Sequence, residues 1–394
     1  MPINSIRDID IRGKRVFIRC DFNVPLDGNG VIKDDTRIRM AIPTIEYALG
    51  QAAKCILTSH LGRPKGERRP EMSLRPVAVR LGELLNREVK FVEDCVGDKV
   101  KAAVAALPAG EALLLENLRF HAGETKNDPL FSAELASLAD VYVNDAFGTA
   151  HRAHASTVGV PALIKEKAAG LLLKDELDSL TRIMTNPEKP LVAVFGGVKV
   201  SDKIEALRHL ISLLDAMLVG GAMANTFLKA QGLGVGASRV EDDMIDTARE
   251  IMGSALEAGC SLQLPVDVVV GDGPDPGVRG EVVDVGAIPE GKMALDIGPR
   301  TVDAYCVEIL RARTIVWNGP MGVFEIESCS KGTMEIAEAI AAASGFSVVG
   351  GGDTLRAINK AGVADRISCI STGGGAFMEF IAGQTLPGVA ALEV

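Results

Sequence analysis

The chain has 394 residues, of which 47% are hydrophobic and 24% charged, so it can build a large core and its length favours two domains. Its formal net charge of −10 argues against a nucleic acid as partner, because binding to a phosphate backbone needs a basic surface. No apolar run approaches the roughly 20 residues that span a bilayer, which excludes a membrane-spanning helix and predicts no membrane partner.

Short apolar strands alternate with helical patterns along the whole chain, which is typical of βα units. In the first half, strands are predicted at residues 16–19, 55–58, 89–92, 113–115 and 141–143. In the second half, they are predicted at residues 191–195, 216–219, 266–270, 314–317, 347–349 and 367–370. Helical patterns between the strands are clearest at residues 100–106, 134–138, 203–214, 243–258 and 332–342.

These elements predict an α/β protein with two doubly wound parallel sheets, since one parallel sheet holding every strand would be unusually large. A single (β/α)₈ barrel is the alternative, but the number of strands differs and helices are missing after some of them. Residues 168–185 have a helical apolar pattern that Asn186-Pro187 ends. We expect the boundary between the two domains to lie on this helix.

The seven cysteines lie far apart and none belongs to a C-x-x-C pair, a pattern typical of reduced cytosolic thiols. The first residues also lack the basic and then apolar layout of a signal peptide. We therefore expect a cytoplasmic protein.

Arginine and histidine recur after the predicted strands of the first half. In an open α/β sheet, ligands bind beyond the carboxyl ends of the strands, so these positions are candidates for a site. The segments are Asp21-Phe22-Asn23, Ser59-His60-Leu61-Gly62-Arg63, Glu116-Asn117-Leu118-Arg119-Phe120 and the stretch from Asn144 to Arg152. Arg37 lies in a polar stretch soon after Asn23 and could reach the same edge. Guanidinium groups form paired hydrogen bonds with carboxylate or phosphate. The recurrence of arginine therefore favours an anion pocket over scattered surface arginines.

Glycine replaces arginine after the strands of the second half. The segments are Gly196-Gly197-Val198-Lys199-Val200-Ser201-Asp202-Lys203, Gly220-Gly221-Ala222, Asn318-Gly319-Pro320-Met321-Gly322, Gly350-Gly351-Gly352-Asp353-Thr354 and Thr372-Gly373-Gly374-Gly375-Ala376. Glycines at a strand-to-helix turn leave backbone N–H groups free for phosphate oxygens. The carboxylate of Asp353 in such a turn can hold the magnesium ion that accompanies a nucleotide. The second half therefore predicts a nucleotide site.

Three other motifs were considered, and none of them indicates a functional site. The chain has no G-x-x-x-x-G-K-[ST], so it is not a P-loop enzyme. The glycines from Gly232 to Gly236 faintly resemble a dinucleotide fingerprint, but they follow a helical pattern instead of a strand, and we reject that interpretation. His151-x-x-His154 has no cysteine or carboxylate at ligand spacing, which disfavours a metal site there.

The motifs together resemble one family, phosphoglycerate kinase. They occur in the family's order and cover nearly the whole chain: RCDFNVP at 19–25, SHLGRP at 59–64, ENLRF at 116–120, DAFGTAHR at 145–152, GGVKVSDK at 196–203, WNGPMGVFE at 317–325, GGGDT at 350–354 and TGGGA at 372–376. Ala294 departs from the pattern, because some members have glycine there, which affects a detail of the adenine slot.

The resemblance implies two Rossmann-like lobes joined by a helix, with a cleft between them. Residues 1–168 would bind 3-phosphoglycerate, residues 169–379 would bind the nucleotide, and residues 380–394 would return to the first lobe. It implies reversible phosphoryl transfer from 1,3-bisphosphoglycerate to ADP, with Mg²⁺ accompanying ATP or ADP. We expect a monomer, because no large apolar helix face stands out.

The resemblance also assigns residues by motif. Those that would bind the glycerate substrate are Asp21, Phe22, Asn23, Arg37, His60, Leu61, Gly62, Arg63, Arg119 and Arg152. Those that would bind the nucleotide are Lys203, Gly220, Gly221, Asn318, Glu325, Gly351, Gly352, Asp353 and Thr354, with Glu325 at the ribose and Asp353 at the metal. Catalytic roles would fall to Arg37, Lys199, Gly374 and Gly375.

The implied chemistry suits these residues. In the reverse direction the acceptor is a carboxylate with a pKa of roughly 3.5, so it needs no general base. The protein has only to position the groups and neutralise charge, and the lobes must close to bring the reacting oxygens within about 3–3.5 Å. Two alternatives stay open: another acyl-phosphate-forming kinase that acts on a phosphorylated carboxylate, and a two-lobed binding protein without activity. The missing signal peptide and Asp353 argue against the second.

Overall fold

The computed structural model describes residues 3–393. The chain forms two compact units, the first comprising residues up to Leu177 together with those from Thr385, and the second running from Asp178 to Gln384. The division falls inside helix α7 (Leu171–Thr185), so this helix belongs to both units. We expected the divisions at 168/169 and 379/380. The observed divisions, at 177/178 and 384/385, lie nine and five residues later.

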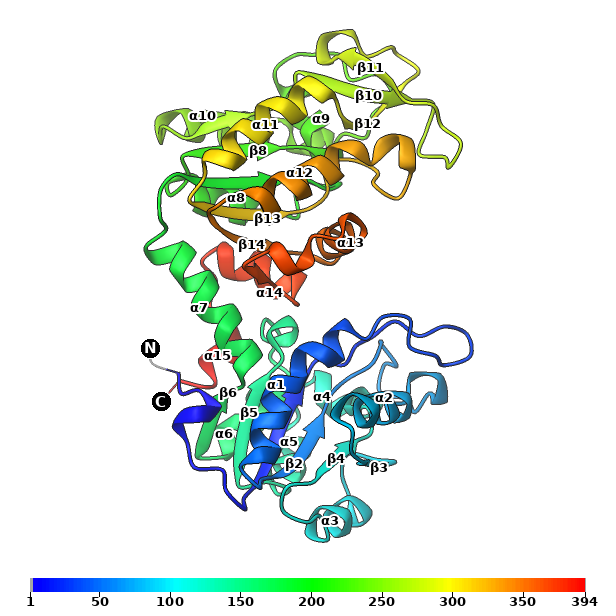
Figure 1. The fold of residues 1–394 in the computed structure, drawn as a ribbon, viewed down its shortest axis with the longest axis vertical. Coiled ribbons are helices and arrows are strands. Elements are labelled where there is room, and N and C mark those ends of the chain that lie inside the picture. The colour runs from blue at the N-terminus through cyan, green and yellow to red at the C-terminus, as the bar shows by residue number, and fades with distance from the viewer. Residues whose placement is uncertain (1–2, 394) are drawn as a thin grey trace. The chain divides into compact units, whose positions relative to one another are not determined.

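The first unit is built on a six-stranded parallel sheet with the order β3-β4-β2-β1-β5-β6 (Figure 1). Its strands are β1 (Arg15–Cys20), β2 (Lys54–Thr58), β3 (Val89–Val92), β4 (Ala112–Leu115), β5 (Val141–Asp145) and β6 (Glu166–Ala169). Its helices are α1 (Thr36–Gly50), α2 (Arg75–Leu85), α3 (Asp98–Ala105), α4 (Ala122–Thr125), α5 (Pro129–Ala136), α6 (Val160–Leu163) and α15 (Pro387–Ala390). The central strands are buried along nearly their whole length, as parallel strands between helices usually are.

The second unit has a six-stranded parallel sheet with the order β15-β14-β13-β7-β8-β9. Its strands are β7 (Leu191–Phe195), β8 (Ala216–Val219), β9 (Ser261–Gln263), β13 (Thr314–Asn318), β14 (Phe346–Gly350) and β15 (Cys369–Ile370). Its helices are α8 (Ile204–Ile211), α9 (Gly221–Ala230), α10 (Ile245–Glu257), α11 (Pro299–Arg311), α12 (Lys331–Ala342), α13 (Gly352–Ala361) and α14 (Gly374–Ile381). The fold class is therefore α/β with two parallel sheets, as predicted, and the barrel alternative is wrong.

A third sheet was not predicted. Strands β10 (Asp267–Gly271), β11 (Glu281–Asp284) and β12 (Met293–Ile297) form a small antiparallel sheet with the order β11-β10-β12. The strand expected at 266–270 is β10, so it belongs to this sheet and not to the parallel one. Its apolar run was compatible with either sheet, because periodicity does not distinguish a parallel from an antiparallel partner.

Two further differences concern short elements. Strands β6 and β9 lie at sheet edges and have few apolar residues, so no apolar run marked them. The helix expected from residue 168 begins at Leu171, because Ala168 and Ala169 end β6 and pair with Val143 and Asn144. Near the C-terminus, the Gly388 N–H donates to the Ala150 carbonyl at 2.8 Å, which fastens α15 to the first unit.

Candidate functional site

The carboxyl ends of the parallel strands in the first unit gather the predicted polar segments at one edge of the sheet. Arg19 of β1 is in register with Thr58 of β2, and Cys20 is in register with Asp145 of β5. The residues that follow these strands are therefore neighbours in space, although they lie far apart in the chain.

Hydrogen bonds connect these segments. Asn23 Oδ1 accepts from the Gly62 N–H at 2.8 Å, and Arg119 donates to the Gly62 carbonyl, also at 2.8 Å. Arg37 Nη1 forms an ion pair with Asp21 Oδ2 at 2.7 Å. Five of the predicted substrate positions, from four segments of the chain, thus lie close together around Gly62 and Asp21.

The other predicted positions of this unit differ in exposure. Phe22 and Leu61 pack into the hydrophobic core, so their side chains do not face the edge. Arg63 is exposed and makes no side-chain hydrogen bond or ion pair with residues 3–393. Arg152 Nε lies 3.1 Å from His151 Nε2. A cavity of about 1040 Å³ borders the edge and is lined in part by Asn23, Leu61 and Gly62.

Arg19 begins the motif RCDFNVP but was not predicted as a site residue. In the structure its side chain contacts His60. Its guanidinium is completely buried and donates to Ser156 Oγ at 2.8 Å and to the Cys20 carbonyl. It also lies 3.2 Å from His60 Nδ1. An arginine can only donate hydrogen bonds, so His60 Nδ1 must accept, and the proton of the neutral ring must reside on Nε2.

Positive charge accumulates at this edge. Burial first, and then Arg19, Arg119, Arg37 and Arg152, hold the pKa of His60 well below its ordinary value, so the ring is neutral at pH 7. Burial together with Arg19 and Arg152 lowers the pKa of Arg119 to about 10. Cations thus outnumber the carboxylates Asp21 and Glu124 at this edge, which is the electrostatic signature of a site for an anion.

His151 and His154 lie near the same arginines. Burial lowers the pKa of His154 to about 4 and also lowers that of His151, with neighbouring arginines adding to both effects. Glu124 is completely buried nearby and accepts hydrogen bonds from the backbone N–H and the Oγ of Ser156. These residues were not predicted, because a buried arginine, histidine or glutamate has no pattern in the sequence that separates it from a surface residue.

In the second unit, the glycine segments form tight turns at the carboxyl ends of the strands. Gly221 has a φ of +66°, and a Cβ atom there would lie 2.5 Å from the Gly197 nitrogen. Gly351 has a φ of +103°, and its Cβ would lie 2.9 Å from Asn318 Nδ2. Only glycine fits both the backbone conformation and the close approach at these two turns.

These turns border a cavity of about 270 Å³ within the second unit. Gly221, Glu325 and Asp353, all predicted nucleotide positions, line it together with Ala294, Leu295 and Phe324. It combines apolar walls with a few polar groups, which is the usual composition of a pocket for a small organic ligand.

Lys203 lies beside this cavity. Its Nζ donates to Asn318 Oδ1, while Asn318 Nδ2 donates to the Gly350 carbonyl at 2.8 Å. Thr354 Oγ1 accepts from the Gly319 N–H at 2.8 Å. Burial lowers the pKa of Lys203 to about 8, although Asp202 and Asp353 act in the opposite direction. A cation with a lowered pKa beside bare amides is suited to a phosphate group.

Two helices begin at the glycine turns without a side-chain cap. Gly351 is the N-cap of α13 and Gly373 is the N-cap of α14, and neither can accept from the first N–H groups of its helix. Gly374 and Gly375, the predicted catalytic glycines, open α14. A Cβ added at Gly352 would meet no atom within 4 Å, so the start of α13 is open. Both helix ends can therefore receive an anion.

Asp353 is the predicted metal ligand, and its surroundings fit that role. Its carboxylate lies in the first turn of α13, is 67% exposed, and pairs with Arg356 at 2.7 Å. A carboxylate at the rim of a phosphate-type pocket is the ligand that magnesium prefers when it also binds a nucleotide. Lys199 is exposed and makes no ion pair with the residues that the structure describes.

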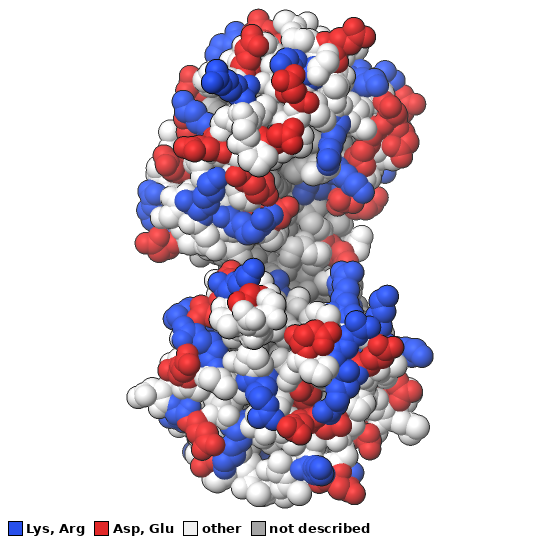
Figure 2. All heavy atoms as spheres, turned by 90° about the vertical axis from the view of Figure 1, so that its right-hand side faces the viewer, with Lys and Arg blue, Asp and Glu red and all other residues white. Residues whose placement is uncertain are grey.

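Charge elsewhere on the surface is mixed. On the face drawn in Figure 2, basic and acidic side chains are intermingled over both units. None of the helices in the described part of the chain has the length and hydropathy of a bilayer-crossing segment.

An anion-binding edge in one α/β unit and a glycine-lined pocket in the other define a protein that handles phosphate-bearing ligands. The family model described as phosphoglycerate kinase matches residues 6–384. A protein of Solibacter usitatus named phosphoglycerate kinase is 56% identical over 100% of both chains, and one of Moorella thermoacetica is 54% identical over 98% of both. The chain belongs to the phosphoglycerate kinase family.

Solved structures agree with this assignment. The phosphoglycerate kinase of Coxiella burnetii is 45% identical, with a TM-score of 0.90 over 99% of both chains. That of Pyrococcus horikoshii is 34% identical, with a TM-score of 0.88 over 99% of this chain and 98% of that one. The resemblance seen in the motifs is therefore confirmed for the family and for the fold.

Proposed function

We propose that this protein catalyses the reversible transfer of a phosphoryl group from 1,3-bisphosphoglycerate to ADP, which yields 3-phosphoglycerate and ATP in glycolysis. Family membership over nearly the whole chain supports this activity. The observation that carries it at the level of residues is the surplus of buried cations around His60, which suits a substrate with both a carboxylate and a phosphate. Nothing favours another acyl-phosphate-forming kinase, the alternative left open above.

In this proposal the arginine edge binds the glycerate substrate. Arg63, Arg119 and Arg152 neutralise its phosphate and carboxylate charges, while His60 donates a hydrogen bond from Nε2. Asp21 and Asn23 hold Arg37 and the Gly62 backbone in place, as their hydrogen bonds indicate.

The glycine-lined pocket binds the nucleotide. Lys203 lies near the phosphates, Glu325 near the ribose, and Thr354 holds the turn through the Gly319 N–H. The phosphate-binding turns also include Gly220, Gly221, Asn318, Gly351 and Gly352. Asp353 would hold the Mg²⁺ that accompanies ATP or ADP, and the bound ion supplies neutralisation of phosphate charge.

Charge neutralisation is the catalytic task that remains, because the acceptor carboxylate is already ionised at neutral pH. We assign it to Arg37, to Lys199, and to the amides of Gly374 and Gly375 at the start of α14. In-line transfer requires the two bound substrates to approach within about 3–3.5 Å, so we propose that the units close when both are bound. We further propose that the protein acts as a monomer in the cytoplasm.

A coupled spectrophotometric assay tests this function. Wild-type protein is expected to turn over 3-phosphoglycerate in a reaction that needs both ATP and Mg²⁺. Lys199→Ala is expected to lower kcat at least about a hundredfold, the scale of one lost transition-state contact, with nucleotide affinity changed far less. Lys189→Ala, which removes an exposed lysine of an ion pair with Asp215, is the matched control.

Two outcomes would count against the proposal. Turnover of acetate or another simple carboxylate at the same rate as 3-phosphoglycerate would favour a different acyl-phosphate-forming kinase. Equal losses of kcat and of nucleotide affinity in Lys199→Ala would reduce this residue to a binding role.

A further inference from the structure

Three potential metal ligands that have no role in the sites described above lie together in the first unit. Asp94 and Cys95 follow the edge strand β3, and His121 follows the 3₁₀ turn Leu118–Phe120 that comes after β4. Because β3 and β4 are parallel neighbours, both segments emerge at the same edge of the sheet. One ligand atom from each side chain lies within 4.8 Å of the other two.

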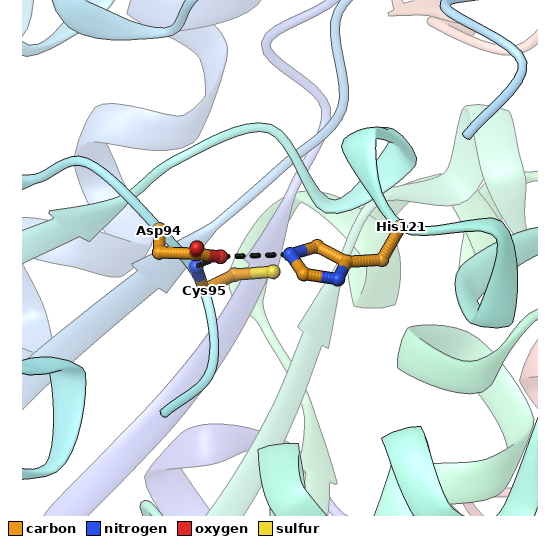
Figure 3. A group of neighbouring side chains, drawn as sticks. All are labelled: Asp94, Cys95 and His121. Carbon is orange, nitrogen blue, oxygen red and sulfur yellow. Dashed lines mark hydrogen bonds and ion pairs between the residues drawn. The ribbon is translucent and has the colours of Figure 1, made fainter. Parts of the chain in front are cut away.

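The three side chains already point toward a common centre (Figure 3). His121 Nε2 lies 2.7 Å from Asp94 Oδ1, which also accepts from the Cys95 N–H at 2.8 Å. The His121 ring stacks on Phe131 with centroids 5.2 Å apart, which limits its rotation. Cys95 is buried, whereas the side chains of Asp94 and His121 are 41% and 34% exposed. The cluster is thus ordered on its inner side and reachable from solvent on its outer side.

Carboxylates surround the thiol. Asp94 precedes Cys95 in the chain, and the carboxylates of Glu124 and Glu116 lie near enough to act on its sulfur. Glu124 and Glu116 are themselves buried, so solvent screens their charges poorly. This part of the unit therefore favours a cation, in contrast to the arginine edge.

We propose that Asp94, Cys95 and His121 form a binding site for a thiophilic divalent cation such as Zn²⁺. Thiolate, imidazole and carboxylate are the ligands that zinc prefers, whereas magnesium prefers oxygen alone, so this site is chemically distinct from Asp353. On binding, the Cys95 thiol gives its proton to solvent as the metal–sulfur bond forms. His121 Nε2 loses the proton that it donates to Asp94 Oδ1, and the neutral ring then carries its proton on Nδ1. The resulting thiolate and the Asp94 carboxylate together balance the two positive charges of the ion.

Metal binding requires the three ligand atoms, which now lie within 4.8 Å of one another, to take tetrahedral spacing. Tetrahedral coordination with bonds of about 2.0–2.3 Å sets ligand atoms about 3.3–3.6 Å apart. His121 Nε2 and Asp94 Oδ1 must therefore separate by less than 1 Å from their hydrogen-bonded distance of 2.7 Å. Three protein ligands leave a fourth position for water on the exposed side. Arg68 lies 3.4 Å from the other Asp94 oxygen, Oδ2, and can keep that partner.

Binding would link the segment after β3 to the segment that carries Arg119, two residues before His121. The competing interpretation is a metal-free ion pair between His121 and Asp94 over a core cysteine. The two interpretations differ in whether the Cys95 sulfur bonds to an added ion.

Cobalt titration distinguishes them, because Co²⁺ replaces zinc and has visible absorption that reports its ligands. We expect wild-type protein to show a near-ultraviolet thiolate-to-cobalt band and intense tetrahedral bands in the visible, both removed by added Zn²⁺. Cys95→Ser should lose the thiolate band, and His121→Gln should weaken Co²⁺ binding at least about tenfold. Cys306→Ser, at a cysteine that is part-exposed elsewhere, should match wild type.

Thermal unfolding provides a second readout that does not need the Cys95 variant to be stable. Zn²⁺ should raise the Tm of wild-type protein and of Cys306→Ser, with a smaller shift in His121→Gln, because an ion that binds only the folded state stabilises it. A wild-type spectrum without a thiolate band would overturn the proposal. So would the same band in Cys95→Ser, or equal Tm shifts in the wild type and His121→Gln.

Discussion

Arg19 shows how one buried side chain controls the chemistry of another. Its guanidinium lies 3.2 Å from His60 Nδ1 and can only donate, so it holds His60 as the tautomer with its proton on Nε2. Burial first, and then the nearby arginines, lower the pKa of His60 and keep the ring neutral. His60 is thereby prepared as a hydrogen-bond donor to an anion without carrying a charge of its own.

The first prediction concerns this tautomer. In ¹⁵N-labelled wild-type protein, the His60 signals should report a protonated Nε2 and a bare Nδ1, with no titration between pH 6 and pH 8. Arg19→Met removes the donor and one positive charge, so we expect a mixture of tautomers and a higher pKa for His60. The apparent KM for 3-phosphoglycerate should rise about tenfold or more, the scale of a lost hydrogen bond to a charged group.

The control is Arg12→Met, at an arginine whose side chain is 74% exposed and pairs with Asp10. The His60 signals are assigned by their loss in His60→Gln. Unchanged His60 signals in a folded Arg19→Met protein would show that Arg19 does not set the tautomer.

The second prediction concerns Lys203 and pH. Burial lowers the pKa of Lys203 from 10.5 to about 8. Phosphate binds the charged amine, so nucleotide affinity should fall above pH 8, approaching about tenfold per pH unit. The stability of the free protein should change in the opposite direction. The unfolded chain keeps a proton that the folded chain has lost, so the unfolding free energy gains from this group as pH rises from about 8 towards 10.5.

Isothermal titration of ADP with Mg²⁺ between pH 7 and pH 9.5 measures the first effect. Lys203→Arg keeps its charge over that range and should show a much flatter profile. A wild-type affinity that does not change with pH, or the same slope in Lys203→Arg, would contradict this assignment.

At the scale of elements, strand ends and helix starts form both sites. Parallel strands bring their carboxyl ends to one edge, so segments far apart in the chain meet there without any direct pairing between them. The turn from β8 into α9 is an example, because Gly221 opens the helix while its backbone contacts Gly197, which follows β7.

The third prediction tests this turn. In Gly221→Ala, a Cβ atom would lie 2.5 Å from the Gly197 nitrogen, so the two turns must move apart. We expect nucleotide affinity to fall about tenfold or more, and Tm to fall as well. Gly232→Ala is the matched control, because Gly232 also has a positive φ, +87°, but its Cβ would meet no atom within 4 Å. Both variants carry the left-handed backbone cost of about 1–2 kcal/mol.

Only Gly221→Ala adds the steric contact at the pocket. Nucleotide affinity should therefore separate the two variants even where their stabilities are similar. Equal affinities, measured by calorimetry, would place the nucleotide away from this turn.

At the scale of the molecule, the two units divide within α7, and the chain returns to the first unit after Gln384. Two segments thus connect the units, which makes the ends of α7 and residues 382–386, between α14 and α15, the candidate hinges. Hinges of this kind absorb backbone rotation at the ends of rigid elements.

The fourth prediction is that the units close in response to ligands. Small-angle scattering should show a smaller radius of gyration with 3-phosphoglycerate and a nucleotide bound together than with either one alone. The physical reason is that transfer needs both ligands within reach of each other. A radius that stays the same with both ligands bound would exclude closure, and a concentration-dependent mass in the same experiment would exclude a monomer.

The sequence by itself determined the fold class and most elements of the two parallel sheets, because alternating apolar strands and helices have local periodicity. It also determined the family, because glycine and arginine motifs are contiguous and follow a characteristic order. These features depend on neighbouring residues, and a linear pattern records them directly.

Only the tertiary structure decided which residues meet. Arg19 and His60 lie 41 positions apart, and Asp94 and His121 lie 27 apart, so no local pattern marks either pair. The short edge strands β6 and β9 and the antiparallel sheet of β10, β11 and β12 were missed for the same reason. Their stability comes from partners distant in the chain, and burial and protonation are likewise set by packing that the order of residues does not display.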